Sequence, residues 1–303
     1  MKLTRLRRHA TQQLGRFYQL YYRYYRAGRD SNLVLFYPDF PDRRAAILQI
    51  ASAMGLTLTN NPKLKCDLAF FWQDATFREP DETLKELAGR TKVVNFHCRD
   101  ISKSRVDEAF RESFGYSSFV DPTTYVGKCV RKSELNAQHD GFVIEAPIKE
   151  KVEGFIYQKL LQRVEEDTLV VDFRVGVFGN TLTSFCTRYK EIENRFGRSI
   201  SQRLADERTY LSEEERVNIL KFCRKIGLEY GEIDMIRDEK DQRLYLLDAN
   251  NTPFWPLRSF NISQEDRQGM LDQYEAAFRE QFLEPGHKQA PAAMGEQAGV
   301  AGS

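Results

Sequence analysis

Two acidic residues and one asparagine in the last third of the chain have the types and spacing of a metal site. Asp234 lies inside an apolar run, 230–236, and Asp248 and Asn250 close a second run, which begins at position 244. The charged segment between the runs predicts two neighbouring β-strands joined by a solvated turn. In an antiparallel pair Asp234 lies near Asp248, and Asn250 shares a face with Asp248 because side chains two residues apart point the same way. Such oxygen ligands suit Mg²⁺, which completes its shell with water and phosphate oxygens.

A plainer interpretation of segment 248–253 is a strand end that runs into a polar turn. A turn does not account for Asp234, because a carboxylate inside an apolar strand is costly unless something compensates it. The pair of carboxylates therefore favours the metal site.

This stretch resembles the C-terminal magnesium motif of the ATP-grasp superfamily, which includes D-alanine:D-alanine ligase, glutathione synthetase and tubulin tyrosine ligase. In that family a strand with Asp is followed by a hairpin partner that ends in Glu-x-Asn and by a turn with Pro. Asp234, Asp248, Asn250 and Pro253 match, with Asp in place of the usual Glu at 248. The resemblance implies that the first three hold Mg²⁺, or Mn²⁺ in its place, and that the nucleotide is ATP. It also implies an α/β (α+β) protein with the ATP-grasp fold, in which two α+β lobes sandwich ATP.

Upstream segments match the family's nucleotide-binding elements in their order. Lys103 matches a lysine at a helix start that reaches ATP in the ligases, although a surface lysine is the more common explanation. Lys132 matches the lysine that ends a strand and contacts the α/β-phosphates, with Lys128 as its competitor. Segment 154–161 resembles the hinge strand between the lobes. The resemblance implies that the residues beside the adenine are Gln158, Lys159, Leu160 and Leu161.

The loop after Lys132 departs from the family pattern. Segment 133–141 has one glycine and a histidine, His139, where the family's phosphate loop is rich in Gly and Ser. For His139 two interpretations stand side by side, a phosphate or acceptor contact and a solvated loop histidine.

A predicted hairpin carries the candidate catalytic residues. Its strands cover 169–178 and 182–189, and Asp172 and Arg174 share a face on the first strand. In ATP-grasp folds, arginines on these strands hold the γ-phosphate or the acceptor carboxylate, and the resemblance assigns this role to Arg174 and Arg188. Structural ion pairing of Asp172 with either arginine is the alternative. The polar segment 190–205 after the hairpin is predicted to be mobile.

Glu232 departs from the family. In D-alanine:D-alanine ligase an arginine two positions before the metal Asp stabilises the tetrahedral oxyanion, and here that position is Glu232. An acid does not do that work, so either another arginine substitutes or the acceptor differs. Recognition of a cationic amine substrate by Glu232 is the corresponding hypothesis.

The elements that position these residues follow from hydrophobic periodicity. Strands at 33–37, 66–72 and 92–96 alternate with helices at 41–54 and 80–88 and predict a small parallel α/β domain, residues 30–98, without a phosphate-binding glycine motif. The expected ATP-grasp domain covers 99–283, with a smaller lobe at about 116–157 and a larger lobe at about 158–283. In the smaller lobe, strands are expected at 125–131 and 142–145. Helices are expected at 99–115, at 212–226 after a Ser212–Glu215 capping box, and at 264–282.

The two ends of the chain differ from the rest. Residues 1–29 are basic and rich in tyrosine, which predicts an amphipathic helix that either packs on the protein or rests on an anionic membrane or polyanion. Residues 284–303 predict a disordered tail. The net charge of +1 does not require nucleic acid, and five scattered cysteines without metal spacing indicate a reducing, cytoplasmic setting. The sequence leaves the oligomeric state open.

The resemblance implies an ADP-forming carboxylate–amine ligase that works through an acylphosphate. In this reaction Lys132, Arg174 and Arg188 neutralise phosphate oxygens, and no nucleophilic residue is required. Two alternatives remain at this level. One is a kinase of the same fold that phosphorylates a hydroxyl. The other is a nucleotide-binding protein without turnover that attaches to a membrane or polyanion through residues 1–29.

Overall fold

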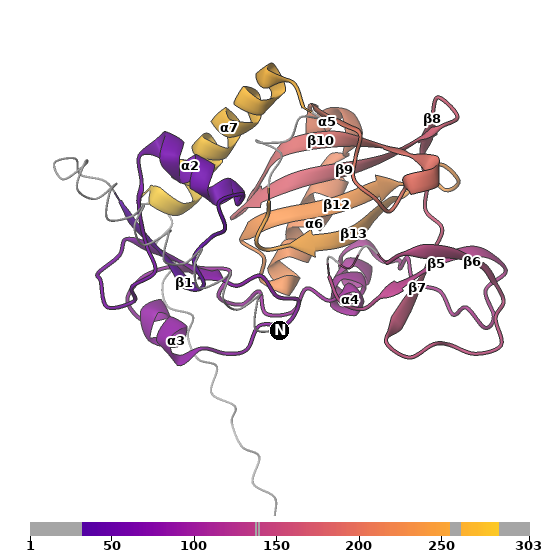
Figure 1. The fold of residues 1–303 in the computed structure, drawn as a ribbon, viewed down its shortest axis with the longest axis horizontal. Coiled ribbons are helices and arrows are strands. Elements are labelled where there is room, and N and C mark those ends of the chain that lie inside the picture. The colour runs from indigo at the N-terminus through magenta and orange to yellow at the C-terminus, as the bar shows by residue number, and fades with distance from the viewer. Residues whose placement is uncertain (1–31, 137, 139, 255–261, 285–303) are drawn as a thin grey trace, which may run out of the picture.

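The computed structural model describes residues 32–254, except 137 and 139, and residues 262–284. They form three β-sheets, and the first and third lie at opposite ends of the molecule (Figure 1). The predicted helix 1–29, His139 and the predicted tail after Glu284 lie outside the described residues. None of the helices within them combines the length and apolar character that crossing a bilayer requires.

The N-terminal sheet is parallel throughout, as the alternation of strands and helices predicted. Its strands run in the order β2–β1–β3–β4. They are β1 (Leu33–Pro38), β2 (Thr57–Thr59), β3 (Leu68–Trp72) and β4 (Val93–Val94). Helix α2 (Ala46–Met54) connects β1 to β2, and α3 (Glu82–Ala88) connects β3 to β4. Strand β2 was missed, because three residues are too few for a periodic signal.

Asn95 explains why β4 is shorter than the strand predicted at 92–96. Its backbone has a φ of 62°, which ends the extended conformation. The fully buried side chain accepts the N–H groups of Glu229 and Tyr230 at 2.8 and 2.9 Å and donates to the Tyr230 carbonyl at 2.7 Å. Asn95 therefore joins the N-terminal sheet to the segment that enters β12.

The large sheet has six strands and is antiparallel. Its order is β11–β10–β9–β12–β13, with β8 paired to β9. The predicted hairpins are β9 (Leu169–Phe178) with β10 (Thr181–Glu191) and β12 (Tyr230–Arg237) with β13 (Leu244–Asn250). The short strands are β8 (Val164–Glu165) and β11 (Ser201–Leu204), and a 3₁₀ turn covers Ile192–Asn194. The prediction of a mobile segment at 190–205 was wrong for β11, which pairs with β10.

Two helices, α4 (Lys103–Phe114) and α6 (Glu213–Ile226), pack on one face of this sheet (Figure 1). Helix α6 begins with the predicted capping box, in which Glu215 N donates to Ser212 Oγ at 3.2 Å and Ser212 N to Glu215 Oε2 at 2.8 Å. Helix α4 starts later than predicted, at Lys103, because Ser102 caps it by accepting the N–H of Arg105. The short helix α5 (Glu207–Tyr210) precedes α6.

The opposite face of the large sheet is covered at one end. Helix α7 (Gln264–Phe278), extended by a π-helical turn at Arg279–Leu283, packs there together with the N-terminal sheet. Phe178 and Tyr230 of the large sheet belong to this second core, with Phe70 from β3 and Tyr274 and Phe278 from α7. The other end of the face carries the charged side chains described below.

The third sheet is small and antiparallel. It consists of β5 (Gly127–Ser133), β6 (Phe142–Ala146) and β7 (Phe155–Lys159), in the order β6–β5–β7. These strands are the ones predicted for the smaller lobe and the hinge. Strand β5 runs to Ser133, two residues past its expected end, so that Lys132 belongs to the strand.

Candidate functional site

One face of the six-stranded sheet carries a row of acidic and basic side chains. The strand register sets Arg174 opposite Asp234, Asp234 opposite Asp248, and Arg188 opposite Asp172. Because side chains alternate along a strand, Phe173 and Ile233 point to the other face, where they are fully buried. We call the following residues the charged face: Asp172, Arg174, Arg188, Lys190, Glu232, Asp234 and Asp248.

Both predicted catalytic arginines bind the carboxylate of Asp234. Arg174 Nε and Nη2 lie 2.7 and 2.9 Å from its two oxygens, a bidentate geometry. Arg188 Nη2 lies 3.0 Å from Asp234 Oδ2. Burial raises the pKa of Asp234, but the two guanidinium groups outweigh this and hold that pKa well below its usual range. The predicted metal ligand of β12 is therefore ionised and placed directly beside both arginines.

Each of these arginines also contacts a second carboxylate. Arg174 Nη1 lies 3.1 Å from Glu232 Oε2, and Arg188 Nε lies 2.5 Å from Asp172 Oδ1. Lys190 Nζ adds a contact of 2.7 Å to Asp172 Oδ2. The structural ion pair that was the alternative interpretation of Asp172 and Arg188 is thus present, and it lies in the same network as Asp234.

Glu232 is the most enclosed acid of the charged face. Its side chain is 2% exposed, and its only ion pair within the described residues is the one to Arg174. That contact lacks hydrogen-bond geometry, so neither carboxylate oxygen accepts a hydrogen bond from any described residue. Burial raises the pKa of Glu232 to about 7 although Arg174 lowers it. An amine substrate at this position, as hypothesised from the sequence, competes with Arg174.

Asp248 faces lysines instead of arginines. Lys103, at the start of α4, and Lys132, on β5, lie close enough for their charges to lower the pKa of Asp248, although burial outweighs them and raises it. Burial likewise lowers the pKa of Lys132 to about 8. Lys103 Nζ also donates to the carbonyl of Leu135 at 2.6 Å. The charges of two of the four lysines predicted to bind ATP, Lys103 and Lys132, therefore act on a predicted metal ligand.

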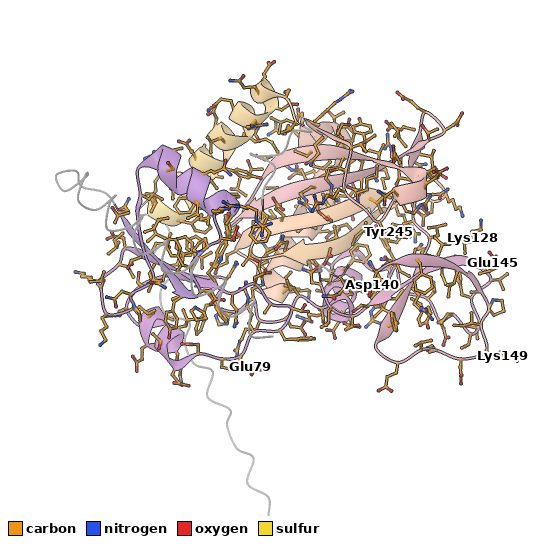
Figure 2. The ribbon with its side chains drawn as sticks, viewed as in Figure 1. Glu79, Lys128, Asp140, Glu145, Lys149 and Tyr245 are labelled. Atoms are coloured by element: carbon orange, nitrogen blue, oxygen red, sulfur yellow. The ribbon has the colours of Figure 1, made fainter. Side chains whose placement is uncertain are left out.

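Lys128 occupies a different environment from Lys132. Both point to the same face of the three-stranded sheet, because they lie four residues apart on β5. Lys128 is exposed and lies opposite Glu145 of β6, and Figure 2 shows these two residues close together on this sheet. The charge of Lys132 acts on Asp248, whereas Lys128 lies opposite Glu145.

The side chains of two predicted hinge residues, Gln158 and Lys159, point to opposite faces of the three-stranded sheet. Gln158 lies on the face of Lys132 and is buried, and its Nε2 donates to Ser118 Oγ at 2.6 Å. Ser118 in turn donates to Asp107 of α4 at 2.9 Å. Lys159 points the other way, with its Nζ against the Tyr245 hydroxyl and 3.3 Å from Asp241 Oδ2. The Gln158 side chain is therefore fixed by α4, and that of Lys159 by the β12–β13 hairpin.

Leu160 and Leu161 continue from β7 toward the large sheet. The Leu160 N–H donates to the Lys128 carbonyl at 3.3 Å, and the Leu161 side chain packs against the main core. Among the described residues, the Leu160 carbonyl and the Leu161 N–H have no hydrogen-bond partner. An adenine requires one backbone donor and one acceptor at its edge, and these two groups fit that requirement.

The donor set fits an ion that takes the rest of its ligands from phosphate and water. Asp234 and Asp248 lie opposite each other, Asp248 Oδ1 accepts the Ala249 N–H at 3.1 Å, and Asn250 Oδ1 accepts the Thr252 N–H at 3.0 Å. In the part of the chain that the structure describes, no three His, Cys, Asp or Glu side chains form a metal cage by themselves. Two carboxylates and one carboxamide match Mg²⁺ in a phosphate complex better than a fully protein-bound cation.

Sequence reasoning missed three groups that the structure places at the site. Lys190 lies two residues after Arg188 on the same strand, so the alternation that identified Arg188 also pointed to Lys190. Ser118 and Tyr245 carried no such signal, because their contacts with Gln158 and Lys159 join segments 40 and 86 residues apart.

Comparison with known proteins rests on structure, because no family model and no curated protein matches the sequence. The ATP-grasp ligase PsnB, in complex with a minimal precursor, Mg and ADP, superposes with a TM-score of 0.55 and 14% identity, covering 83% of this chain and 100% of that chain. The same ligase with the precursor peptide PsnA2 and AMPPNP gives 0.52 and 14%, with the same coverage of both chains. D-alanine–D-alanine ligase from Bacillus anthracis gives 0.44 and 11%, over 82% of this chain and 99% of that chain, which is too low to add to the argument. The likeness to PsnB covers 83% of this chain. The chain has the α/β ATP-grasp fold, as its motifs predicted.

Proposed function

We propose that this protein is a Mg-ATP-dependent ligase that activates a carboxylate as an acylphosphate and joins it to an amine, with release of ADP and phosphate. The observation that carries the proposal is the placement of Asp248 directly opposite Asp234, with lysines around the first and arginines around the second. Phosphoryl transfer requires mainly positioning and charge neutralisation, and this arrangement supplies both.

Under this proposal the lysines and the arginines of the site have different roles. Lys103 and Lys132 neutralise the nucleotide phosphates, and Gln158 to Leu161 line the adenine. Asp234, Asp248 and Asn250 would hold Mg²⁺, which would supply a charge that draws electrons from the phosphate oxygens. Arg174 and Arg188 neutralise the oxygens of the transferred phosphoryl group and of the acylphosphate. Their rigid forks suit such planar oxyanions better than lysine does.

The bonds balance without a protein nucleophile. The γ-phosphoryl group moves from ATP to a carboxylate oxygen of the substrate and leaves ADP. The amine nitrogen then attacks the carbonyl carbon, the C–N bond forms, the C–O bond to phosphate breaks, and the nitrogen loses its extra proton to solvent. The acceptor class remains part of the proposal, and peptides with acidic side chains belong in the first set of substrates because PsnB binds a precursor peptide.

The test is ADP and phosphate release from Mg-ATP with pooled carboxylates and acidic peptides, in the presence of hydroxylamine. Hydroxylamine traps an acylphosphate as a hydroxamate. We expect hydroxamate with wild type, its loss with Asp248→Ala, and its retention with Asp272→Ala, a matched change on an exposed turn of α7. Thermal unfolding of both variants verifies the fold.

Other results of this assay would indicate a different function. ATP turnover with a phosphorylated hydroxyl product, identified by mass, would establish a kinase. Absence of Mg-dependent ATP binding in wild type would contradict the proposal as a whole.

A further inference from the structure

Asp234 shares each of its two arginines with another carboxylate. Arg174 bridges Asp234 and Glu232, and Arg188 bridges Asp234 and Asp172. With Lys190, three bases face three acids in this part of the charged face. Glu232 and Asp172 are both more than nine-tenths buried. The function proposed above gives no role to either of them.

The two contacts of Arg174 differ in kind. Toward Asp234 it makes two hydrogen bonds, of 2.7 and 2.9 Å. Toward Glu232 it makes an ion pair of 3.1 Å without hydrogen-bond geometry. The guanidinium is therefore bound firmly to one acid and held close to a second that has hydrogen-bonding capacity to spare.

A divalent cation and Arg174 compete for the same oxygens of Asp234. A cation that coordinates Asp234 weakens its two Arg174 hydrogen bonds, because it draws electrons from the same oxygens and repels the guanidinium charge. A buried guanidinium that loses its anion is strongly destabilised unless another anion replaces it. Glu232 is the acid already within 3.1 Å.

We infer that Glu232 is a positioning residue that retains Arg174 when a divalent cation takes the oxygens of Asp234. In this role Glu232 lowers the cost of metal binding and keeps the arginine beside the reacting phosphate. Arg188 differs from Arg174 because its Nε already donates a hydrogen bond to its second acid, Asp172. The inference rests on the proposed function only in requiring that the site binds a metal–nucleotide complex.

The test measures Mn²⁺ binding by the loss of the free-ion electron paramagnetic resonance signal, with ADP present and without any acceptor. We expect Glu232→Gln to weaken Mn²⁺ binding about tenfold, because Arg174 then has no second acid and holds Asp234 more tightly. In an Arg174→Gln background, the same Glu232→Gln change should alter Mn²⁺ binding less than about twofold, because the competitor is gone.

A matched control and the thermal unfolding of every variant separate positioning from loss of fold. Glu86→Gln makes the same chemical change on the exposed side of α3 and should leave Mn²⁺ binding unchanged. An unchanged affinity in Glu232→Gln overturns the inference. An equal loss with and without Arg174 also overturns it, because the carboxylate would then act on the metal by its charge alone.

The same titration distinguishes this inference from the proposed ligase activity. Wild type that binds no Mn²⁺ with ADP overturns both. The expected Mn²⁺ affinities without any hydroxamate formation support the role of Glu232 and count against the ligase.

Discussion

The two faces of the six-stranded sheet are built from the same strands and have opposite chemistry. Phe173 and Arg174 are neighbours in β9, yet Phe173 packs among apolar side chains with α6 behind it, and Arg174 lies between two carboxylates. On β12, the side chains of Ile233 and Asp234 likewise point to opposite faces. Alternation along each strand is sufficient to separate them.

The energetics of the two faces differ as well. Burial of the apolar side chains removes hydrocarbon from water, at about 25 cal/mol for each Å². The ion pairs of the charged face gain Coulomb energy but lose hydration, so that buried pairs of this kind add little net stability. The apolar face therefore stabilises the sheet, and the charged face holds charges at fixed positions beside one another. Substitutions on the two faces should affect different measurements.

The largest effect is expected from Phe173→Ala on the apolar face. Its ring packs against Phe185 and Tyr210 at centroid distances of 5.2 and 5.3 Å and is fully buried. We expect the free energy of unfolding, measured in urea, to fall by about 3–5 kcal/mol. The Mn²⁺ affinity of the folded fraction should stay unchanged. A parallel loss of Mn²⁺ affinity would mean that the two faces are not independent.

The second-largest effect is expected from a substitution beside the charged face. Lys132 and Asp248 interact electrostatically, and Lys132→Met should lower turnover of Mg-ATP about 100-fold, because one phosphate-neutralising charge is lost. The free energy of unfolding should change by less than about 1 kcal/mol, because Met keeps the apolar stem.

Lys128→Met is the matched control for this substitution. It makes the same change on the same face of β5, beside Glu145, and should reduce turnover less than about threefold. Equal losses in the two variants would show that proximity to Asp248 does not decide which lysine serves the phosphates.

Most of the large sheet and the N-terminal domain could be predicted from local patterns. Strand β9 was predicted with its observed ends, and the capping box located the start of α6, because period-two alternation and a cap are signals within one segment. Strand β11 could not be predicted in this way. Three of its four residues are polar, and pairing with β10 makes the segment a strand.

The candidate site, too, could be predicted only in part from local sequence patterns. Alternation predicted that Arg174 shares a face with Asp172 and that Asp248 shares one with Asn250. The contacts of Arg174 with Asp234 and Glu232 depend on the register between β9 and β12, which the sequence did not predict. A one-residue change in register turns every side chain to the other face. Register between strands that are about 60 residues apart is set by the whole sheet rather than by either strand. The roles of the individual site residues therefore stay predictions, although the face on which they lie is observed.

The smallest effect concerns the contact between the three-stranded sheet and the six-stranded sheet. Tyr245, near the start of β13 and labelled in Figure 2, binds Asp241 through its hydroxyl at 2.6 Å, and Lys159 of β7 lies over its ring at 4.2 Å. Tyr245→Phe removes the hydroxyl that Lys159 and Asp241 share, so the hinge loses one anchor and the Kd of ADP should rise about threefold. Tyr116→Phe is the matched control, because its hydroxyl donates to the Leu244 carbonyl at 2.6 Å within the same aromatic group and does not contact β7. An equal change in both variants, measured by calorimetric titration, would assign the effect to aromatic packing instead of the hinge anchor.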